Sequence, residues 1–408
     1  MDHDADVIIT GGGLNGPALG LALSRAGLSV IVIDAQPARA RAEANFDGRA
    51  YALAIASKRL LEAIGVWPRV AGEAQPIREI RTCDGRPGEG PAPLHMRFEA
   101  GEIEEGPMGF MVEDRHLYAA FLAAMEEEPR LTHLPEARVV QQAAGPAGIT
   151  VTLEDGRVLC GRVLAGCDGR ASGTARRAGI TRTGWGYGQT ALVCAVAHER
   201  PHHGVAHQFF MPAGPLAILP LRGNRSSIVW SEATATAEAI AALDDAAFLE
   251  VLRPRFGDFL GRIELAGGRF SYPLSLTLAD RYTAPRLALV GDAAHGVHPI
   301  AGQGLNLGLR DVGALAEVLV EAHRRGEDIG AADVLDRYQS WRRFDATALA
   351  LGMDAVNRLF SSDNPLLRLA RDAGMGLVDA LPGLKRAFIR QAAGIAGTPP
   401  RLLRGRAL

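Results

Sequence analysis

The sequence has few cysteines and no long apolar run. Its four cysteines, Cys83, Cys160, Cys167 and Cys194, are scattered over 408 residues. None belongs to a Cys-x-x-Cys pair or has histidines around it at the spacing of a zinc site. This pattern argues against a disulfide reductase or a metal centre, and it predicts reduced thiols. No run of about 18 apolar residues is present, so no membrane-spanning helix is expected.

The chain also lacks an excess of one charge and a secretory leader. Its formal net charge of −2 gives no reason to expect nucleic-acid binding. The first five residues are acidic and a strand-like run follows them at once, so no signal peptide is expected. The length predicts two or three domains, or one large α/β unit with an insertion. We therefore expect a cytoplasmic protein, at most attached to the surface of the inner membrane.

A glycine-rich turn lies between two apolar runs at the N-terminus. The pattern predicts a strand, a turn, a helix and a second strand over residues 6–10, 11–16, 17–26 and 28–33. Gly11 permits the tight turn, Gly13 lets the backbone approach a pyrophosphate, and Gly16 lets the helix pack on the strand. Asp34 ends the second strand, where it can accept hydrogen bonds from ribose hydroxyls. We predict a dinucleotide site; the alternative is a glycine-rich turn in an unrelated α/β unit.

A second corner lies far downstream, between Arg286 and Asp311. Residues 287–290 form a short apolar run that predicts a buried strand, and Gly291-Asp292 turns the chain. The loop from His298 to Gly304 opens a long helix near Leu305. Its glycines let the backbone approach a ligand, and the helix start offers N–H groups and partial positive charge to an anion. The alternative is a corner that binds nothing.

The residues between these corners predict an inserted domain. Strand-like runs recur at residues 191–197, 206–211, 216–221, 226–230 and 268–276, with a helix at 245–256. Short turns between successive strands favour an antiparallel sheet. The Gly- and Pro-rich segment 71–107 predicts short strands and loops. A helix is expected at 113–128, a hairpin at 149–160, and a separate buried strand at 163–167.

The chain after Asp311 reads as helical. Helices are expected at residues 312–324, 331–360 (one helix or two), 365–381 and 385–393. Their basic residues are Arg368, Arg371, Lys385, Arg386 and Arg390, followed by Arg401, Arg404 and Arg406 in the tail. This face could rest on an anionic membrane surface, or it could be an ordinary solvated face.

Two arginines are further candidates for a cofactor site. Arg49 stands in a Gly-Arg-Ala loop, where it could line a cofactor or simply face solvent. Arg115 lies in the first turn of the helix expected at 113–128, where the helix dipole disfavours a cation. It therefore pairs either with a bound anion or with a nearby glutamate.

Three motifs occur in a fixed order: Gly11–Gly16 with Asp34, Asp168-Gly169, and Gly291-Asp292 with His298-Pro299. In this order they resemble the FAD-dependent aromatic hydroxylases, the group of para-hydroxybenzoate hydroxylase. The run HPIAGQGLNLGLRD, from His298 to Asp311, is the most specific part and resembles the ubiquinone-biosynthesis hydroxylase branch. The resemblance covers nearly the whole chain, including Asp47–Leu53 and the helical C-terminus.

The resemblance implies an α/β fold in which a Rossmann-like FAD-binding domain carries an inserted antiparallel-sheet substrate domain and a helical C-terminal region. The expected bounds are 1–75, 108–188 and 277–330 for the FAD-binding domain, 76–107 and 189–276 for the substrate domain, and 331–408 for the C-terminal region.

It also implies residue roles along the cofactor. Gly11, Gly13, Gly16 and Asp34 would hold the ADP half of FAD, with Val139 near the adenine and Arg49 and Arg115 along the cofactor. Asp168 and Gly169 would serve the region shared with the nicotinamide cofactor. Gly291 and Asp292 would bind the ribityl or pyrophosphate part, and Pro299 would pack near the flavin ring. Gly302, Gln303, Gly304, Leu305 and Asn306 would direct backbone N–H groups to the ring.

The implied reaction is hydroxylation of the ring of a polyprenylated phenol, with NADH or NADPH, O2 and a hydroperoxide at flavin carbon C4a. The flavin carries the chemistry. His298 is a weak catalytic candidate and is expected to be a structural partner of its loop. Phe209, Phe210, Met211, Leu219 and Trp230 are candidates for an apolar channel to the substrate, or plain core. Alternatives are a hydroxylase of a small soluble phenol, a relative that reduces prenyl double bonds, and a non-catalytic FAD-bearing scaffold.

One position departs from the family pattern. The motif usually has an arginine three residues after the serine that corresponds to Ser172, and this chain has Ala175 there, followed by Arg176 and Arg177. The departure puts the contact with the nicotinamide cofactor in question more than it does FAD.

Overall fold

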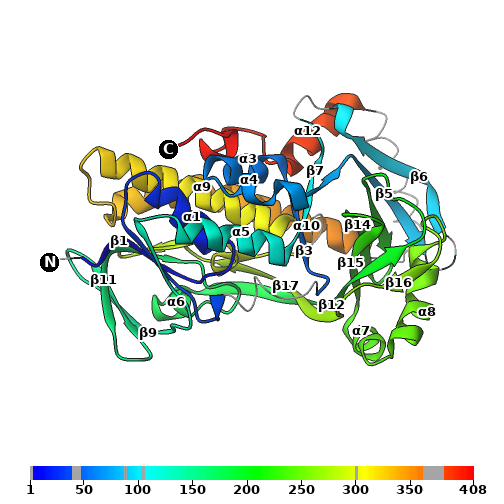
Figure 1. Ribbon diagram of the computed structural model, residues 1–408, viewed down its shortest axis with the longest axis horizontal. Helices are drawn as coiled ribbons and strands as arrows, with labels where there is room; N and C mark the ends of the chain where they lie inside the picture. Colours follow the sequence, from blue (N-terminus) through cyan, green and yellow to red (C-terminus); the bar gives the residue numbers. More distant parts are fainter. Residues whose placement is uncertain are drawn as a thin grey trace.

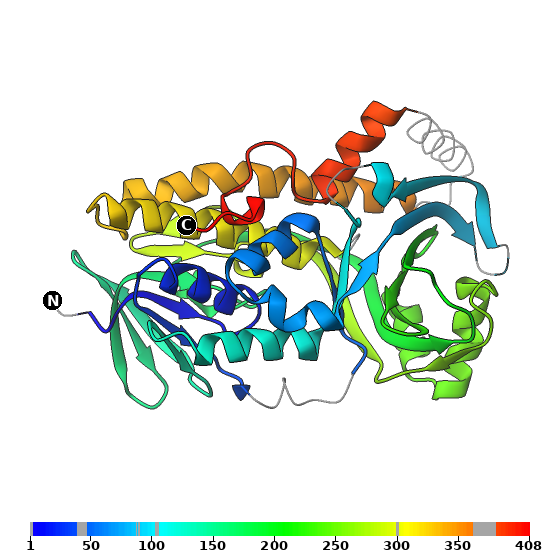
Figure 2. The same cartoon turned by 45° about the horizontal axis from the view of Figure 1, so that its top comes forward.

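The computed structural model describes residues 3–38, 47–86, 88, 90–102, 106–298, 302–361 and 381–408, with the backbone alone at 90–95, 382 and 384. The molecule is elongated, with the N-terminal strands at one end and a sheet-rich part at the other (Figure 1). Two long helices, α9 (Gln303–Arg324) and α10 (Ala332–Phe360), lie side by side, and α10 reaches from the N-terminal part to the sheet-rich part (Figure 2).

The first sheet is the Rossmann-like part. Its strands are β1 (Ala5–Thr10), β2 (Val30–Ile33), β8 (Leu131–Leu134), β9 (Val139–Ala144), β10 (Ile149–Leu153), β11 (Val158–Gly166), β18 (Thr283–Ala284) and β19 (Leu287–Leu289). β1 pairs in parallel with β2 and with β11, and β11 pairs in parallel with β19. The strand of the downstream corner therefore belongs to the same sheet as the strand of the N-terminal turn. This arrangement confirms the predicted α/β class.

The second sheet has the order β20-β17-β12-β15-β14-β13-β5-β6, with β16 beside β12. Its strands are β5 (Glu79–Arg86), β6 (Gly90–Glu99), β12 (Arg182–His198), β13 (Val205–Met211), β14 (Gly214–Leu221), β15 (Arg225–Ala233), β16 (Ile263–Leu265), β17 (Phe270–Ala279) and β20 (His295–Gly296). The antiparallel sheet predicted for this part is present, and one of its pairs, β13 with β5, runs parallel. The chain between these two strands passes through β8, β9, β10 and β11 of the first sheet, so no hairpin forces them to be antiparallel.

A small third sheet contains β3 (Ala50–Leu53), β4 (Gln75–Ile77) and β7 (Gly109–Glu113). Ile77 and Met111 from this sheet share a buried cluster with Ala195 and Ala206 of the second sheet. The small sheet thus packs on one face of the large one and joins it to the first sheet's domain.

The remaining elements are mostly helices. They are α1 (Asn15–Ser24), α3 (Ile55–Ala63), α4 (Trp67–Val70), α5 (Asp114–Glu126), α6 (Gly173–Arg177), α7 (Thr234–Ala241), α8 (Asp245–Phe256) and α12 (Pro382–Ala392), with single turns at Ala71–Glu73, Ala100–Glu102, Gly291–Ala293 and Leu402–Arg404. The helix expected at 245–256 is present with those ends, those expected at 17–26, 113–128 and 385–393 are present with shifted ends, and the segment 331–360 forms one helix, α10. The helix predicted at 365–381 lies outside the described residues except for Leu381.

Three local predictions were wrong. Segment 71–107 contains the long strands β5 and β6, although its glycines and prolines suggested short pieces. The strands expected at 157–160 and 163–167 are one strand, β11 (Val158–Gly166). A Cβ at Gly161 would lie 2.9 Å from Ile8, so this glycine marks a close approach of backbone to β1 and not a break. The short helix α7 was missed because its alanines and threonines give no apolar period.

Candidate functional site

The N-terminal turn depends on three glycines that touch other parts of the fold. A Cβ added at Gly11, whose φ is +106°, would overlap the carbonyl oxygen of Cys167. A Cβ at Gly16 would overlap the carbonyl oxygen of Gly11, and one at Gly12 would overlap the Asp34 carboxylate. Gly12 was not among the predicted site residues, and nothing in the motif spacing distinguishes it from a linker glycine.

Gly13 behaves differently from its neighbours. A Cβ there would meet no described protein atom within 4 Å. The position opens on the start of α1, which has no side-chain cap. Packing against the described protein atoms therefore does not require a glycine at position 13. Close approach of the backbone to a ligand explains it instead.

Asp34 lies where the sequence placed it, at the end of β2. Its side chain is buried beside Gly12, and its Oδ1 accepts a hydrogen bond from the Gln36 N–H at 3.0 Å. The hydroxyl of Tyr118, on α5, lies 3.5 Å from Oδ2. The carboxylate therefore lies at the rim of the same turn as Gly13.

Asp168 holds its own loop together. Its carboxylate accepts hydrogen bonds from the Ser172 hydroxyl (2.5 Å) and from the N–H and hydroxyl of Thr174 (both 2.9 Å). The Thr174 hydroxyl also lies 2.8 Å from that of Thr10 at the end of β1. The side chain thus ties the start of α6 to the end of β1, and a contact of Asp168 with a cofactor stays a prediction.

Ala175, which stands where the family motif has an arginine, is packed in the core. Ala175 is fully buried, and its N–H donates to the Ser172 hydroxyl. Arg177 reaches strand β9, where its guanidinium donates to the Gln142 side chain at 3.1 Å and to the Val139 carbonyl at 3.3 Å. Burial lowers the pKa of this guanidinium from its usual value. Arg177 therefore anchors the strand that carries the predicted adenine neighbour, Val139.

The downstream corner meets the N-terminal helix directly. Gly291 has φ +63°, and a Cβ there would overlap the side-chain amide of Asn15 on α1. A Cβ at Gly308, on α9, would overlap the same amide. Asn15 is thus held between the two glycines, which brings the two glycine-rich motifs into one place. Asn15 was not among the predicted site residues.

A buried ionic network fixes this corner. Asp311, on α9, is fully buried and accepts hydrogen bonds from the Gly291 N–H (3.0 Å), the His295 ring (2.5 Å) and the Arg342 guanidinium of α10 (2.8 Å). Burial raises the pKa of Asp311, but His295 and Arg342 outweigh it and leave that pKa below its usual value. His295 is therefore part of this buried ionic network.

Asn306 also has a structural use that the sequence did not reveal. Its side-chain carbonyl accepts from the Ala54 N–H (2.8 Å) and the Ser57 hydroxyl (2.7 Å), and its amide donates to the carbonyls of Ala52 and Gly302. It therefore joins the start of α3 to the start of α9.

The first turn of α9 keeps the features predicted for it. Gly302 precedes the helix with φ +63° and a Cβ there would lie 2.9 Å from Ala52, while a Cβ at Gly304 would meet no described atom within 4 Å. Gln303 is buried and Leu305 is half-buried. The helix start has no side-chain cap. Pro299 lies outside the described residues.

Asp292 lies beside two arginines that the sequence did not mark as a site. The Arg170 Nε donates to its carboxylate at 3.2 Å and Arg170 Nη2 donates to the Val297 carbonyl at 2.7 Å. Arg182 donates to the backbone carbonyl of Asp292 at 3.0 Å. The Asp292 side chain is 35% exposed, so its carboxylate remains accessible beside these cations.

His298 is buried without a hydrogen-bond partner among the described residues. Its side chain is 1% exposed, and neither ring nitrogen is bonded. The ring lies edge-on to Tyr187, with 5.2 Å between ring centroids. Burial, with the nearby Arg170 charge, lowers the pKa of His298 to about 4, so the ring is neutral at pH 7. We expected a structural partner for it in its loop, and none occurs in the described part.

The two arginine candidates bind carboxylates of the protein. Arg49 donates through Nε to Asp47 at 2.7 Å, and its guanidinium lies 3.7 Å from Asp114. Arg115 donates to Glu113 at 2.9 Å. The pair with Glu113 is the second of the two partners expected for Arg115, a nearby glutamate instead of a bound anion. A contact of Arg49 or Arg115 with the cofactor stays a prediction.

The residues present fit a dinucleotide carrying a ring that becomes anionic. Gly13 and Gly304 leave open space at two helix starts that have no side-chain cap. Asp34 lies beside the first and the unpartnered His298 lies close in sequence to the second.

Comparison with known proteins agrees with this assignment. The family described as "FAD binding domain" matches residues 4–351. The ubiquinone hydroxylase UbiL of Rhodospirillum rubrum is 47% identical over 99% of this chain and 94% of its own length. The 3-demethoxyubiquinol 3-hydroxylase of Escherichia coli is 35% identical over 97% of this chain and 100% of its own.

Solved structures show the same fold. The p-nitrophenol 4-monooxygenase PnpA of Pseudomonas putida superposes with a TM-score of 0.80 at 19% identity, over 97% of this chain and 99% of that one. PqsL of Pseudomonas aeruginosa gives 0.76 at 27% identity, over 92% and 99%. The chain belongs to the FAD-binding-domain family of flavin-dependent monooxygenases, in the group that contains the ubiquinone hydroxylases, and FAD is its cofactor.

Proposed function

We propose that this protein hydroxylates the aromatic ring of a polyprenylated phenol on the way to ubiquinone, with NADH or NADPH and O2. The observation that carries the proposal is the match, over nearly the full length of both chains, to proteins named ubiquinone hydroxylase and 3-demethoxyubiquinol 3-hydroxylase. The exposed Asp292, the open Gly13 and the uncapped start of α9 support it.

Bound FAD supplies the chemistry of oxygen activation once the nicotinamide cofactor has reduced it. The protein's part is to bind, orient and exclude water. The start of α1 beside Gly13 binds the pyrophosphate through backbone N–H groups, and Asp34 accepts from the ribose. The start of α9 would lie against the flavin edge that becomes negative on reduction, where the helix dipole would contribute about 0.3–1 kcal/mol, and up to about 2 if buried.

His298 orients the phenol in this proposal. A buried imidazole with no partner costs roughly 1–3 kcal/mol per unsatisfied group, a cost that a bound hydroxyl relieves. With its pKa at about 4, His298 is neutral, so one ring nitrogen is able to accept a hydrogen bond from the substrate hydroxyl and the other is able to donate one. It is therefore a positioning residue: at that pKa the ring is too weak a base to remove the proton of a phenol.

We also propose that the C-terminal helices contact a membrane surface or a partner protein of the pathway. Along α10, Phe344, Leu351 and Leu359 are exposed at helical spacing, and Phe388 is exposed on α12. Arg358 and Arg386 lie beside these apolar residues along the chain. None of the helices in the described ranges is long and apolar enough to cross a membrane.

The decisive experiment is the quinone profile of a strain that lacks this gene. An under-hydroxylated polyprenylated precursor should accumulate, and complementation should remove it. Normal ubiquinone in that strain would exclude the proposal and favour a hydroxylase of a small soluble phenol. Failure of NADH and NADPH to reduce the flavin of the purified protein would favour a non-catalytic scaffold.

The cofactor assignment has its own test. Asp292→Ala should purify with little FAD, because the carboxylate facing Arg170 is lost. A fully yellow Asp292→Ala protein would show that the flavin site is misplaced. Asp280→Ala is the matched control: it removes an exposed carboxylate of the neighbouring turn and should leave FAD content unchanged.

A further inference from the structure

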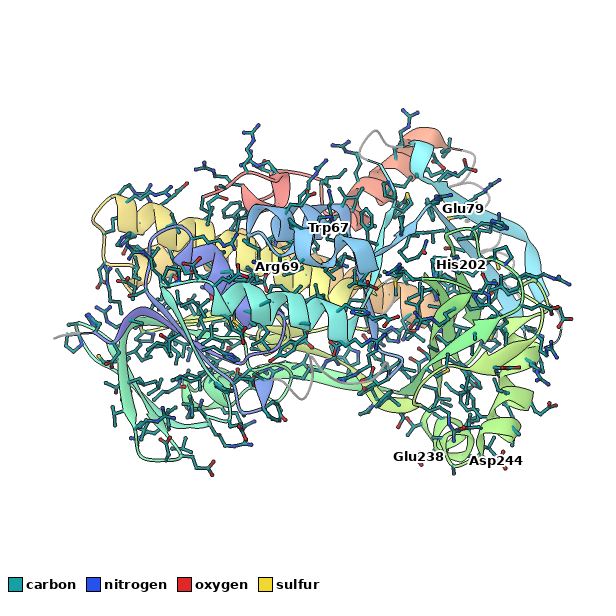
Figure 3. All side chains as sticks on the ribbon, in the orientation of Figure 1. Trp67, Arg69, Glu79, His202, Glu238 and Asp244 are labelled. Atoms are coloured by element: carbon teal, nitrogen blue, oxygen red, sulfur yellow. The ribbon has the colours of Figure 1, made fainter. Side chains whose placement is uncertain are left out.

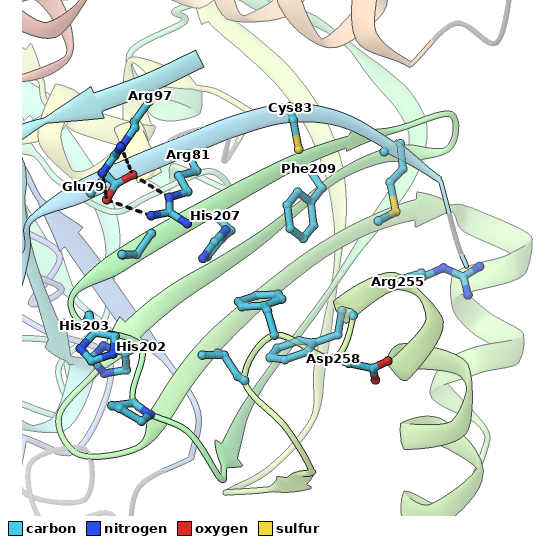
Figure 4. A pocket seen from close by; sticks show the side chains of 18 of the residues that line it. Glu79, Arg81, Cys83, Arg97, His202, His203, His207, Phe209, Arg255 and Asp258 are labelled. Atoms are coloured by element: carbon cyan, nitrogen blue, oxygen red, sulfur yellow. Dashed lines mark hydrogen bonds and ion pairs between the residues drawn. The ribbon is translucent and has the colours of Figure 1, made fainter. Parts of the chain in front are cut away.

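A second cavity lies in the sheet-rich part of the molecule. It has a volume of about 1450 Å³ and is formed by strands β5 and β13, the end of α8 and the loop that follows α8 (Figure 4). Its floor contains alternate residues of β13, Val205, His207, Phe209 and Met211. Since side chains alternate between the faces of a strand, all four lie on one face of the sheet.

This face is turned away from the cofactor domain. Phe209 and Met211 share a buried cluster with Phe248 and Phe256 of α8. The opposite face carries Phe210, which stacks on Phe360 of α10 with 4.0 Å between ring centroids. Of the residues suggested for a channel beside the flavin, Phe209, Met211 and Trp230 therefore belong to the other side of the sheet. Glu79 and His202, which line the cavity, lie toward the end of the molecule opposite the N-terminus (Figure 3).

One half of the cavity is apolar. Phe259 lies 4.5 Å from the His207 ring and 5.5 Å from that of Phe256, measured between centroids. Phe259 is 37% exposed, while Phe209, Phe256 and Leu260 beneath it are buried. Burial lowers the pKa of His207 to about 4, so this histidine adds no charge at pH 7.

The remainder of the lining carries excess positive charge. Six arginines line the cavity, Arg78, Arg81, Arg86, Arg97, Arg253 and Arg255, with the three carboxylates of Glu79, Glu99 and Asp258. Arg253 and Arg255 also pair with Glu250 and Glu232, which do not line it, so the excess is greatest around Arg78 and Arg81. Arg81 and Arg97 both bind Glu79, at 2.6 and 2.5 Å (Figure 4). His202 donates from Nε2 to the Leu221 carbonyl and accepts at Nδ1 from the Gly204 N–H.

We propose that this cavity binds an anionic amphiphile, a long apolar chain with a carboxylate or phosphate head. The chain would lie along Phe209, Phe256 and Phe259. The head would lie by Arg78 and Arg81, the latter using two of its five N–H groups on Glu79. Arginine forks suit carboxylate and phosphate oxygens. Drug-sized ligands occupy pockets of about 300–1,000 Å³; this cavity is larger, which suits a long chain.

The site is separate from the flavin corner, so the proposal does not depend on the reaction proposed above. One head chemistry can come from two sources, a free long-chain carboxylate or an anionic phospholipid. Both would be held by the same residues, and the experiment must distinguish them.

The test is a fluorescence titration of the FAD-loaded protein with dansylaminoundecanoate, a fluorescent carboxylate with a long chain. Saturable binding is expected, and Phe259→Glu should weaken it at least tenfold, because a carboxylate would stand at the apolar mouth. Val158→Glu is the matched control: Val158 is 59% exposed on β11 and should leave the affinity unchanged. FAD content reports the integrity of each variant.

Displacement of the probe by other amphiphiles identifies the charge of the head group and the source of the ligand. Dodecanoate should displace the probe at least ten times more effectively than dodecylamine, and Arg78→Glu should reduce that preference. Displacement by phosphatidylglycerol vesicles but not by monomeric dodecanoate would identify the phospholipid as the source. The proposal is overturned if the probe does not bind, if Phe259→Glu binds like wild type, or if the amine competes as well as the carboxylate.

Discussion

The two corners of the cofactor site are built in different ways. At the N-terminal corner, Gly11 and Gly16 are required by contacts with backbone, and Gly16 packs within the same short stretch of chain. At the downstream corner, Gly291 is held by Asp311 of α9, which in turn depends on Arg342 of α10. The first corner is thus specified by steric contacts with backbone, from Cys167 and from Gly11 itself, and the second by buried charges on other elements.

This difference predicts how each corner fails. At a corner made of close backbone contacts, a side-chain atom added to one of the contacting glycines should destabilise the fold. Changes of charge there should have little effect. A corner held by a buried ionic network should fail when one partner is removed, because the others are left buried and uncompensated. Variants at each corner can therefore break or sharpen the contrast.

The largest effect is expected for Asp311→Ala. It leaves Arg342 and His295 buried without their carboxylate, and breaking a buried pair in this way costs about 3–5 kcal/mol. The free energy of unfolding, measured by urea denaturation of the FAD-free protein, should fall by that amount. Asp345→Ala removes the other, 40% exposed partner of Arg342 and should cost under about 1 kcal/mol. Equal losses in the two variants would show that the network is not what holds the corner.

A smaller loss is expected for Gly16→Ala. The added methyl would overlap the Gly11 carbonyl, so α1 must shift, at about 1–3 kcal/mol of stability and with loss of FAD. Gly13→Ala is the matched control, since its methyl meets no described protein atom within 4 Å. It should leave stability unchanged and weaken FAD binding at least tenfold, measured by equilibrium dialysis. Normal FAD affinity in Gly13→Ala would contradict the placement of the pyrophosphate.

The contrast also explains what the sequence could and could not predict. The first corner was predictable because its strand, turn and acidic end lie within residues 5–34. The roles of Asp311, Asn306 and Arg342 were not, since each depends on a partner brought close only by the fold: Asn306 bonds Ser57, 249 residues away. The parallel β13–β5 pair was missed for the same reason.

The site residues also divide into those that a local motif identifies and those that depend on distant partners. Gly13, Asp34, Asp292 and the start of α9 could be named from motif spacing, and the fold places them around two neighbouring helix starts. Arg170 and Arg177 could not, because the motif places its arginine at the position of Ala175. The outer cavity carries no sequence signal, since its residues come from β5, β13 and α8 and match no motif.

The smallest effect tests whether the downstream corner also contains a buried neutral group, His298. Its folded pKa, about 4, lies below the usual value of 6.5, so the unfolded chain binds more protons between these values. The stability that the neutral ring contributes is complete above pH 6.5 and is lost as pH falls toward 4. The loss amounts to about 1 kcal/mol at pH 5.5. His298→Gln cannot titrate, so its loss of unfolding free energy between pH 7.5 and 5.5 should be about 1 kcal/mol smaller than that of wild type. His203→Asn, at an exposed histidine whose φ of +54° suits asparagine, should keep the wild-type loss. An unchanged loss in His298→Gln would mean that His298 is charged or solvated in the folded protein, and the neutral hydrogen-bond acceptor assigned to the substrate hydroxyl would have to be sought elsewhere.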